Sequence, residues 1–264
     1  MLERTTMNTL KPEKHESLVR HAVVSQKEWE AARKELLKKE KEYTHLRDKL
    51  SAERRKLPWV LVEKDYVFEG PKGKVTLTDL FRGRSQLVVQ HFMFGPEWEE
   101  GCPGCSFGAD HVDGARQHFE HHDVAFAAVS RAPYPKIEKF QKRMGWGFNW
   151  VSSDGSDFNF DYRVSFTKEQ MASGKVSYNF EEADAEIDEL PGHSVFYQDE
   201  EGRIYHTYSS YARGGEEMIT TYAYLDLTPK GRNEKEIMDW MRYHDRYEDA
   251  EPASSCCGTK EAVA

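Results

Sequence analysis

The amino-acid sequence predicts an α/β fold organised around a parallel β-sheet, and two observations carry that prediction. Short apolar runs at residues 87–94 and 123–130 have the nearly continuous hydrophobic character of strands that are buried on both faces. Helical patterns at residues 103–119 and 135–144 alternate with these runs, and a third strand is expected at Val151. This β-α-β-α-β order implies parallel strands that are joined by right-handed crossovers.

A long charged helix is expected before the sheet. Residues 1–24 are polar and irregular, as in an arm that lies on the surface. Ser25 and Glu28 form a capping box, which starts a helix that runs to about Lys56. Apolar residues recur along it at intervals of seven: Trp29, Leu36, Tyr43, Leu50 and Leu57. Such a stripe fits a helix packed along its own domain or on a dimer mate, so a homodimer is an open alternative.

The other elements follow from turn residues and hydrophobic patterns. In chain order they are a strand within 57–68, a turn at 71–73, a strand or helical turn at 75–81, a hairpin around an acidic turn at 199–202, and helices at 216–224 and 234–247. The last helix is amphipathic and carries Trp240 and Tyr243, so it is expected to pack on the domain as a C-terminal extension.

Cys102-Pro103-Gly104-Cys105 stands between the first buried strand and the helix that follows it. Pro103 occupies the favoured first helical position, which places Cys102 at the helix N-terminus. Unpaired N–H groups and the positive end of the helix dipole stabilise a thiolate there and lower its pKa. With a second thiol close behind, the pair can cycle between dithiol and disulfide. Strand, loop, CxxC and helix make a thioredoxin-type arrangement; half of a zinc site is the alternative.

Composition excludes several classes of protein. The chain has 264 residues and a formal net charge of −9, so it lacks the basic footprint that phosphate contacts need. No segment approaches ~18 consecutive apolar residues, and the first twenty residues have no apolar core of a secretory signal. Four cysteines in such a chain point to a reducing compartment. We therefore expect a cytoplasmic protein with no nucleic-acid or membrane partner.

Several sequence blocks resemble a known family. VSQKEWEAARKELLKKEKE, LPWVLVEKDYVF, HFMFGPEWEEGCPGCSF, AVSRAPYPKIEKFQKRMGW, WVSSDGSDFNFDY and YLDLTPKGRNE are similar to the DUF899 family of predicted dithiol-disulfide oxidoreductases. The blocks extend from about residue 23 to 247. The resemblance implies a thioredoxin-like fold and a redox role, and it leaves the substrate open.

A looser likeness extends to peroxiredoxins, in which Cys-Pro also opens a helix after a strand and a loop. Peroxiredoxins place a threonine three residues before this cysteine, where it hydrogen-bonds peroxide, and here Glu99 holds that position. A carboxylate beside Cys102 would also oppose thiolate formation through its like charge. A thiol-dependent peroxidase is therefore the alternative function.

Two segments distant from the cysteines are expected to complete the site. Thioredoxins carry a cis-proline that faces the CxxC, and Pro191 lies close to that position, so Pro191-Gly192-His193 is expected to form a substrate-facing wall. An ordinary loop proline is the alternative. Arg131 follows the second buried strand, at the end where sites in open α/β sheets gather. It is expected to lower a cysteine pKa or to bind an anionic group, with a plain surface arginine as the alternative.

A metal-binding function is the second alternative. Thiolates select soft metals such as Cu(I) and Zn, and an imidazole from His91 or His193 would complete a set with the two cysteines. For His91, which stands in the middle of a buried strand, we favour a core histidine. Cys256-Cys257 in the tail would then pass electrons or soft metals to the CxxC, or would have no role.

These observations converge on a thioredoxin-like oxidoreductase in which Cys102 attacks and Cys105 resolves, with no cofactor and no resident metal. Its substrate is expected to be a protein or small-molecule thiol or disulfide. Six further residues are expected to bind the substrate: Trp98, Pro103, Gly104, Arg131, Pro191 and His193. The predicted division is an arm and helix at 1–57, a thioredoxin-like domain at 58–228, a helical extension at 229–248 and a disordered tail at 249–264.

Overall fold

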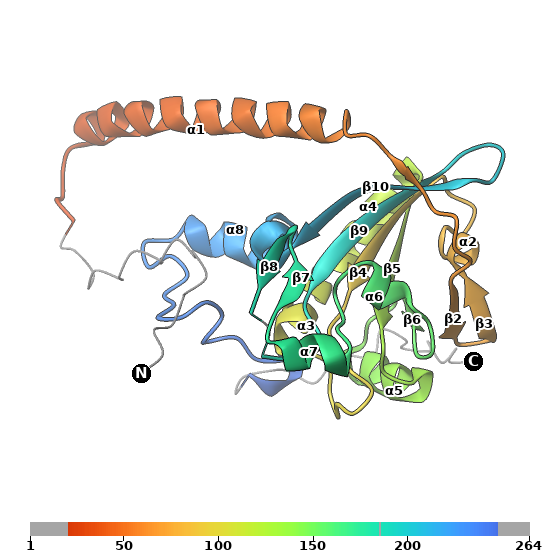
Figure 1. Ribbon diagram of the computed structural model, residues 1–264. Coiled ribbons are helices and arrows are strands. Elements are labelled where there is room, and N and C mark those ends of the chain that lie inside the picture. The colour runs from red at the N-terminus through yellow and green to blue at the C-terminus, as the bar shows by residue number, and fades with distance from the viewer. Residues whose placement is uncertain (1–20, 185, 248–264) are drawn as a thin grey trace, which may run out of the picture.

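One mixed β-sheet forms the centre of the molecule (Figure 1). The computed structural model describes residues 21–184 and 186–247, and within them the sheet has the strand order β1-β10-β9-β4-β5-β6-β2-β3. The strands are β1 (Val60–Leu61), β2 (Val67–Gly70), β3 (Gly73–Thr76), β4 (Gln86–His91), β5 (Val124–Ser130), β6 (Asn149–Ser152), β9 (Gly192–Gln198) and β10 (Ile204–Tyr211). A separate pair, β7 (Val176–Tyr178) and β8 (Glu181–Ala183), lies outside this sheet.

The strand directions identify the fold. β4 is central, and it pairs in parallel with β5 and antiparallel with β9, while β6 continues the parallel part beyond β5. β10 returns antiparallel to β9 around a turn in which Gly202 has a φ of +82°, a conformation that glycine adopts at no steric cost. With the cysteine pair at the start of the helix that follows the central strand and its loop, this is the predicted thioredoxin-like fold, and the predicted β-α-β-α-β unit and hairpin are confirmed.

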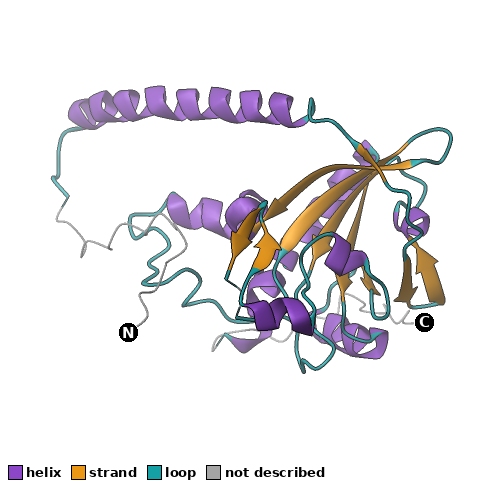
Figure 2. Cartoon of the chain, viewed as in Figure 1, coloured by secondary structure: helices purple, strands orange, loops and turns teal. Residues whose placement is uncertain are grey.

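Helices cover both faces of the sheet (Figure 2). They are α1 (Gln26–Arg54), α2 (Leu77–Leu80), α3 (Pro103–Ala109), α4 (Val112–Phe119), α5 (Tyr134–Met144), α6 (Phe158–Asp161), α7 (Lys168–Ser173) and α8 (Thr220–Asp226), with 3-10 turns η1 (Glu120–His122), η2 (Ala212–Met218) and η3 (His244–Arg246). One core contains Phe92, Phe140 and Trp150 and packs under α3 and α5. A second core, around Leu87 and Phe158, fills the opposite face under α2 and α6.

The helix that follows the cysteines is shorter than its sequence pattern indicates. The apolar spacing from Phe107 to Phe119 predicts one helix, whereas the structure has α3 and α4 with a break at Asp110 and His111. The His111 ring nitrogen Nδ1 lies 2.8 Å from the carbonyl oxygen of Phe107, where it meets a group that a continuous helix would bond through its backbone.

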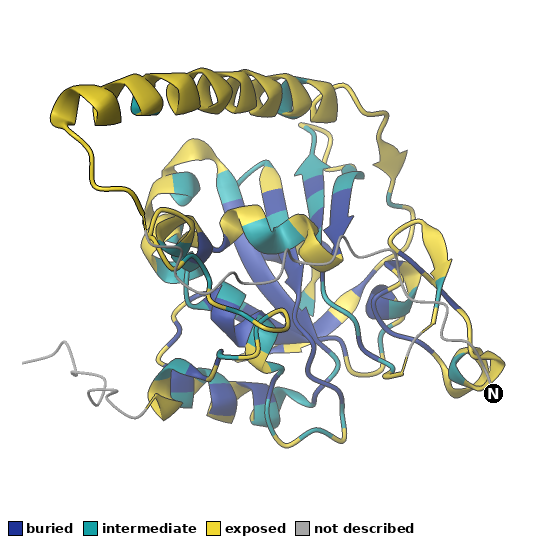
Figure 3. Cartoon of the chain, turned by 90° about the vertical axis from the view of Figure 1, so that its left-hand side faces the viewer, coloured by how far each residue is buried: buried dark blue, intermediate teal, exposed yellow. Residues whose placement is uncertain are grey.

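The long helix α1 stands away from the rest of the molecule (Figures 1 and 3). Its predicted start is confirmed, because Ser25 and Glu28 form both hydrogen bonds of a capping box. None of its residues is buried, and Trp29 and Tyr43 are 53% and 61% exposed. Packing of its apolar stripe along its own domain is therefore wrong, while packing on a second copy stays a prediction.

The C-terminal extension does not form the predicted helix at 234–247. Met238 has a positive φ angle of 64°, which interrupts any helix there, and Asn233, directly before the predicted start, has a φ of 51°. Asp239 instead accepts hydrogen bonds from the backbone N–H groups of Lys235 and Glu236 and holds a turn. Helical structure in this part is confined to η3. The extension nevertheless packs on the domain, where Met241 joins a small core with Phe107 and Tyr222.

Residues 1–20 of the predicted arm, and the tail with Cys256 and Cys257, lie outside the described residues. Within residues 21–184 and 186–247, no helix combines the length and the apolar character needed to cross a membrane. The predicted domain boundaries stay a prediction.

Candidate active site

The two cysteines occupy the first turn of α3 in different environments. Cys102 is the N-cap residue and is partly exposed, whereas Cys105 is buried with 6% of its surface exposed. Both are free thiols. The backbone of Met93, just after β4, holds them, because its carbonyl oxygen accepts from the Cys102 N–H at 2.9 Å and its N–H donates to the Cys105 Sγ at 3.4 Å. The end of the central strand thus fixes both ends of the dithiol.

The environment drives the pKa values of the two thiols apart. A hydrogen bond from the Cys105 thiol is the largest influence on Cys102, and with the backbone N–H groups of Cys105 and Gly104 it outweighs burial and lowers the Cys102 pKa to about 7. The same hydrogen bond, together with burial and the charge of Glu189, raises the pKa of Cys105. A partly exposed thiolate therefore stands beside a buried, protonated thiol, which is the asymmetry that dithiol exchange needs.

Two charged residues near the cysteines differ from their predicted surroundings. The Glu99 side chain is 93% exposed and lies 3.9 Å from Lys136, so the expected repulsion of the Cys102 thiolate is wrong, although the threonine of peroxiredoxins is still missing. Arg131 is only 14% exposed and is paired with Glu189 at 2.5 Å and Asp188 at 2.7 Å. Its guanidinium is thereby bound to this chain's own carboxylates instead of facing a cysteine or an anionic ligand.

A cavity of about 680 Å³ opens beside the cysteines. It lies between the α3–α4 side of the sheet, η2 and the segment at residues 237–238, and most of its lining is apolar. Five of the predicted site residues line it: Cys102, Gly104, Cys105, Pro191 and His193. The described residues that line it do not include Trp98, Pro103 or Arg131.

The predicted wall at Pro191 and His193 thus faces the same space as the dithiol. The described residues contain no cis peptide bond, so Pro191 differs in this respect from the thioredoxin proline. His193 faces the cavity, and burial lowers its pKa to about 4, so that its imidazole is neutral at pH 7. Trp98 instead packs on the aromatic core, with its indole against Gly95.

His91 is a core residue, as favoured from the sequence. It is 1% exposed, its Nε2 lies 2.8 Å from the Ser194 Oγ, and its ring stacks on Tyr162. Burial lowers its pKa to about 3, and its Nδ1 has no hydrogen-bond partner among the described residues. In the part of the chain that the structure describes, no three His, Cys, Asp or Glu side chains are grouped so as to hold a metal ion.

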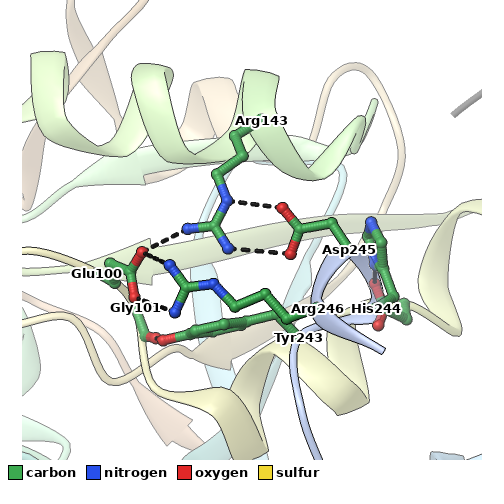
Figure 4. Close-up of polar contacts among 8 residues, drawn as sticks. Glu100, Gly101, Arg143, Tyr243, His244, Asp245 and Arg246 are labelled. Atoms are coloured by element: carbon green, nitrogen blue, oxygen red, sulfur yellow. Dashed lines mark hydrogen bonds and ion pairs between the residues drawn. The ribbon is translucent and has the colours of Figure 1, made fainter. Parts of the chain in front are cut away.

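The loop before Cys102 is held by residues 243–246, here called the C-terminal strap, which the sequence pattern placed on a helix (Figure 4). Tyr243 donates a 2.6 Å hydrogen bond to the carbonyl oxygen of Gly101. Arg246 and Arg143 both bind the Glu100 carboxylate, and Asp245 of the strap pairs with the other side of Arg143 at 2.7 and 2.9 Å. Helix α5 and the strap therefore clamp Glu100 and Gly101 from two sides.

The strap also contacts the far end of α3. The His244 Nδ1 lies 2.6 Å from an Asp110 carboxylate oxygen, and the same oxygen accepts from the Trp146 indole N–H at 2.8 Å. The segment that precedes the strap contributes Ile237 and Met238 to the cavity wall. The sequence pattern placed Tyr243 and its neighbours on a helix, and such a local pattern cannot show that they meet residues more than a hundred positions away.

Comparison with known proteins extends these findings. A family model described as "Bacterial protein of unknown function (DUF899)" matches residues 18–247. The chain belongs to the DUF899 family. The match confirms the resemblance in the sequence blocks, and it covers every element from α1 to η3. No curated protein shows significant similarity to this DUF899 protein.

Solved structures similar to the DUF899 protein are low in identity. A mutant of PrxQ from Xylella fastidiosa is 15% identical with a TM-score of 0.39, over 60% of this chain and 88% of the other. The peroxidoxin BcpB from Mycobacterium tuberculosis is 14% identical with a TM-score of 0.38, over 62% and 95%. A putative thiol:disulfide interchange protein, DsbE, from Chlorobium tepidum is 13% identical with a TM-score of 0.37, over 62% and 97%.

Proposed function

We propose that this DUF899 protein is a thiol-disulfide oxidoreductase that uses Cys102 and Cys105. The observation that carries the proposal is the opposite shift of the two thiol pKa values at the start of α3, beside a cavity that a substrate can enter. A cysteine with a pKa near the ambient pH combines a useful thiolate fraction with good nucleophilicity. Burial of Cys105 keeps the second thiol protonated until the first has reacted.

The exchange follows from this arrangement. The Cys102 thiolate attacks one sulfur of a substrate disulfide, the substrate S–S bond breaks, and the other substrate sulfur leaves as a thiolate that takes up a proton. Cys105 then loses its proton and attacks the Cys102 sulfur, which forms the Cys102–Cys105 disulfide and releases the second substrate thiol. Two electrons pass from the protein dithiol to the substrate. Run in reverse, the same steps oxidise a dithiol.

The other residues that were predicted to bind substrate fall into two groups, those that line the cavity and those that do not. Gly104 supplies an N–H to the Cys102 sulfur, and Pro191 and His193 line the same cavity, so these three are proposed to contact the substrate. Pro103 starts the helix. Trp98 and Arg131 hold surrounding structure, through the aromatic core and the carboxylates at residues 188 and 189.

The test is a pair of single variants. Cys105→Ser is expected to accumulate a mixed disulfide with substrate on Cys102, because the resolving thiol is missing, and Cys102→Ser is expected to abolish the reaction. The native dithiol is expected to titrate as a reversible two-electron couple between about −120 and −270 mV. Unimpaired disulfide reduction by both variants would refute the proposal.

Two alternative functions are decided on the same samples. Turnover of hydrogen peroxide by a protein that does not reduce disulfides would establish the peroxidase, for which Glu99 does not provide the usual hydroxyl donor. Stoichiometric copper or zinc with no cycling disulfide would establish the metal-binding function. Cytoplasmic location and a homodimer stay predictions, the second checked by sedimentation.

A further inference from the structure

The floor of the cavity carries a polar group that this chain does not satisfy. Gln90 of β4 donates from its Nε2 to the Cys105 carbonyl oxygen at 3.1 Å, while its Oε1 is buried with no partner among the described residues. The side chain is 5% exposed and lines the cavity. A buried acceptor without a donor costs free energy, and a ligand that supplied the donor would remove that cost.

The surroundings of Gln90 show where that donor would bind. Gln90 and His193 are direct partners in the antiparallel β4–β9 pairing, so their side chains lie next to each other on the same face of the sheet. Helix η2 passes above them with Gly215, where an added Cβ would come within 3.0 Å of the His193 ring. A neutral imidazole and the Gln90 amide thus form one polar patch in a mainly apolar cavity.

The rest of the cavity lining indicates the length and polarity of a ligand that would fit. Along β4 it reaches from Met93, beside the cysteines, back to Val88, which is a span of ~17 Å at the rise of a strand. Its far end is closed by apolar residues of α4 and β5, among them Phe119 and Phe126. The one arginine that the described lining contributes, Arg213, is exposed at the rim and paired with Glu216 at 2.7 Å. An extended aliphatic molecule fits this lining, whereas a ligand with several carboxylates would meet no unpaired cation.

We propose that the cavity binds a small, mainly aliphatic disulfide whose single hydrogen-bond donor is accepted by Gln90. This substrate class rests on the proposed function, because only a reactive dithiol turns the bound molecule into a substrate. The cavity volume of about 680 Å³ lies within the usual range for small-molecule sites, ~300–1,000 Å³. Cys102 attacks a sulfur at one end of the cavity while the aliphatic part lies over Val88 and Phe126. Two electrons pass from the dithiol to the bound disulfide, whose S–S bond breaks as the Cys102–Cys105 disulfide forms.

Binding is measured first without chemistry, on the full chain with Cys102→Ser and Cys105→Ser. The probes are lipoamide and methyl lipoate, which share a cyclic disulfide and an aliphatic chain but differ in the amide N–H donor. Equilibrium dialysis is expected to give saturable binding of both, with lipoamide about tenfold tighter, the effect of one hydrogen bond to a buried acceptor. Oxidised glutathione, a disulfide with several charges, is expected to show no saturable binding. Equal affinity for lipoamide and methyl lipoate would overturn the role of Gln90, and this comparison needs no variant at that position.

A matched pair of variants on α4 tests the cavity itself. Ala115 lines the cavity, and Ala115→Phe is expected to weaken both probes at least tenfold by occupying the space. Gln117 is exposed on the same helix outside the cavity, and Gln117→Phe is the control that should leave both affinities unchanged. Equal effects of the two variants would overturn the placement of the ligand.

The reductase assay with the native cysteines separates this inference from the proposed function. Reduction of insulin disulfides by a protein whose serine variant binds neither probe would overturn the inference and leave the proposed function standing. Binding of lipoamide with no reduction of any disulfide would overturn the proposed function, and with it the assignment of the ligand as substrate. Binding together with faster reduction of lipoamide than of oxidised glutathione supports both.

Discussion

The hydrogen bond between the two thiols is the feature whose removal should change the chemistry most. The Cys102 pKa is about 7 against an ordinary value of 9.0, and at about 1.36 kcal/mol per pH unit the difference corresponds to ~3 kcal/mol. A hydrogen bond to a charged group contributes ~1.5–3 kcal/mol, so the Cys105 thiol can supply most of this stabilisation. The N–H groups of Gly104 and Cys105 then offset the cost of burial.

Cys105→Ala removes the donor and leaves the backbone N–H groups in place. We expect the pKa of Cys102 to rise by more than about one pH unit, which reduces the thiolate fraction at pH 7 from ~50% to below ~10%. Cys105→Ser keeps a hydroxyl donor at the same position and should hold the pKa near 7. The alkylation rate of Cys102 with iodoacetamide between pH 5 and 10 reports the thiolate directly, in a chain with Cys256→Ser and Cys257→Ser so that one reactive thiol is followed.

The pH dependence of the alkylation rate shows whether the Cys105 thiol lowers the Cys102 pKa. Because the thiolate is the nucleophile, the alkylation rate must rise with pH through the pKa of Cys102 and level off above it. A Cys105→Ala protein whose rate still rises through a midpoint of about 7 would refute the reasoning, since the amides at the start of α3 would then suffice. A midpoint that rises equally in the serine variant would show that the sulfur itself, rather than any donor, is needed.

Three further predictions concern stability, each followed by urea unfolding. Tyr243→Phe leaves the Gly101 carbonyl oxygen without its donor and should lower the free energy of unfolding by ~1–3 kcal/mol. Arg131→Leu leaves Glu189 buried and unpaired, at a cost of ~3–5 kcal/mol at pH 8. The cost should be smaller at pH 5, because burial already raises the Glu189 pKa to about 7 and the carboxyl protonates there. Gly101→Ala would place a Cβ within 2.6 Å of a buried phenylalanine ring and should cost ~1–3 kcal/mol, whereas Gly104→Ala, with its nearest contact at 3.5 Å, should be close to neutral.

Each of the three stability predictions has a control. Tyr224→Phe removes a hydroxyl from a tyrosine that is 69% exposed and should change stability by less than ~0.5 kcal/mol. The double variant Arg131→Leu with Glu189→Leu removes both charges and should recover much of the loss at pH 8. The same loss at pH 5 and pH 8 in Arg131→Leu would show that the carboxylate of Glu189 is not what the arginine neutralises. Equal destabilisation by the two glycine variants would show that the approach to Phe92 is not tight.

The position of the cysteine pair at the start of a helix could be predicted because its signals are local. A buried strand, a proline at the first helical position and the spacing of Cys102 and Cys105 lie within twenty residues of one another, and each constrains the backbone directly. The start of α1 at Ser25 and the end of α5 at Gly145, which has a φ of +67°, could be predicted from the sequence for the same reason. Periodicity and end signals specify elements well when those elements depend little on distant contacts.

The parts that could not be predicted are those decided by distant partners. Arg131 was placed correctly at the end of a strand, but its partners Asp188 and Glu189 come from a loop that no local pattern relates to it. Residues 234–247 carry a helical pattern, yet the contacts of Tyr243 with Gly101 and of Arg246 with Glu100 outweigh helix propensity, which is small per residue. Gln90 could have been noticed as a polar residue inside a buried strand, where its amide needs hydrogen-bond partners.

The C-terminal strap connects the locally specified cysteine turn with contacts that are distant in the sequence. Its residues hold Glu100 and Gly101, the two positions directly before Cys102, while Ile237 and Met238 in the preceding segment form part of the cavity wall. Any movement of the segment at residues 237–246 therefore changes both the backbone that leads to Cys102 and the space in front of its thiol. The N–H groups that help to stabilise the Cys102 thiolate belong to the turn that this backbone enters. Reactivity of the dithiol and access to it are consequently properties of one clamped unit, although the cysteines and the strap lie about 140 residues apart in the chain.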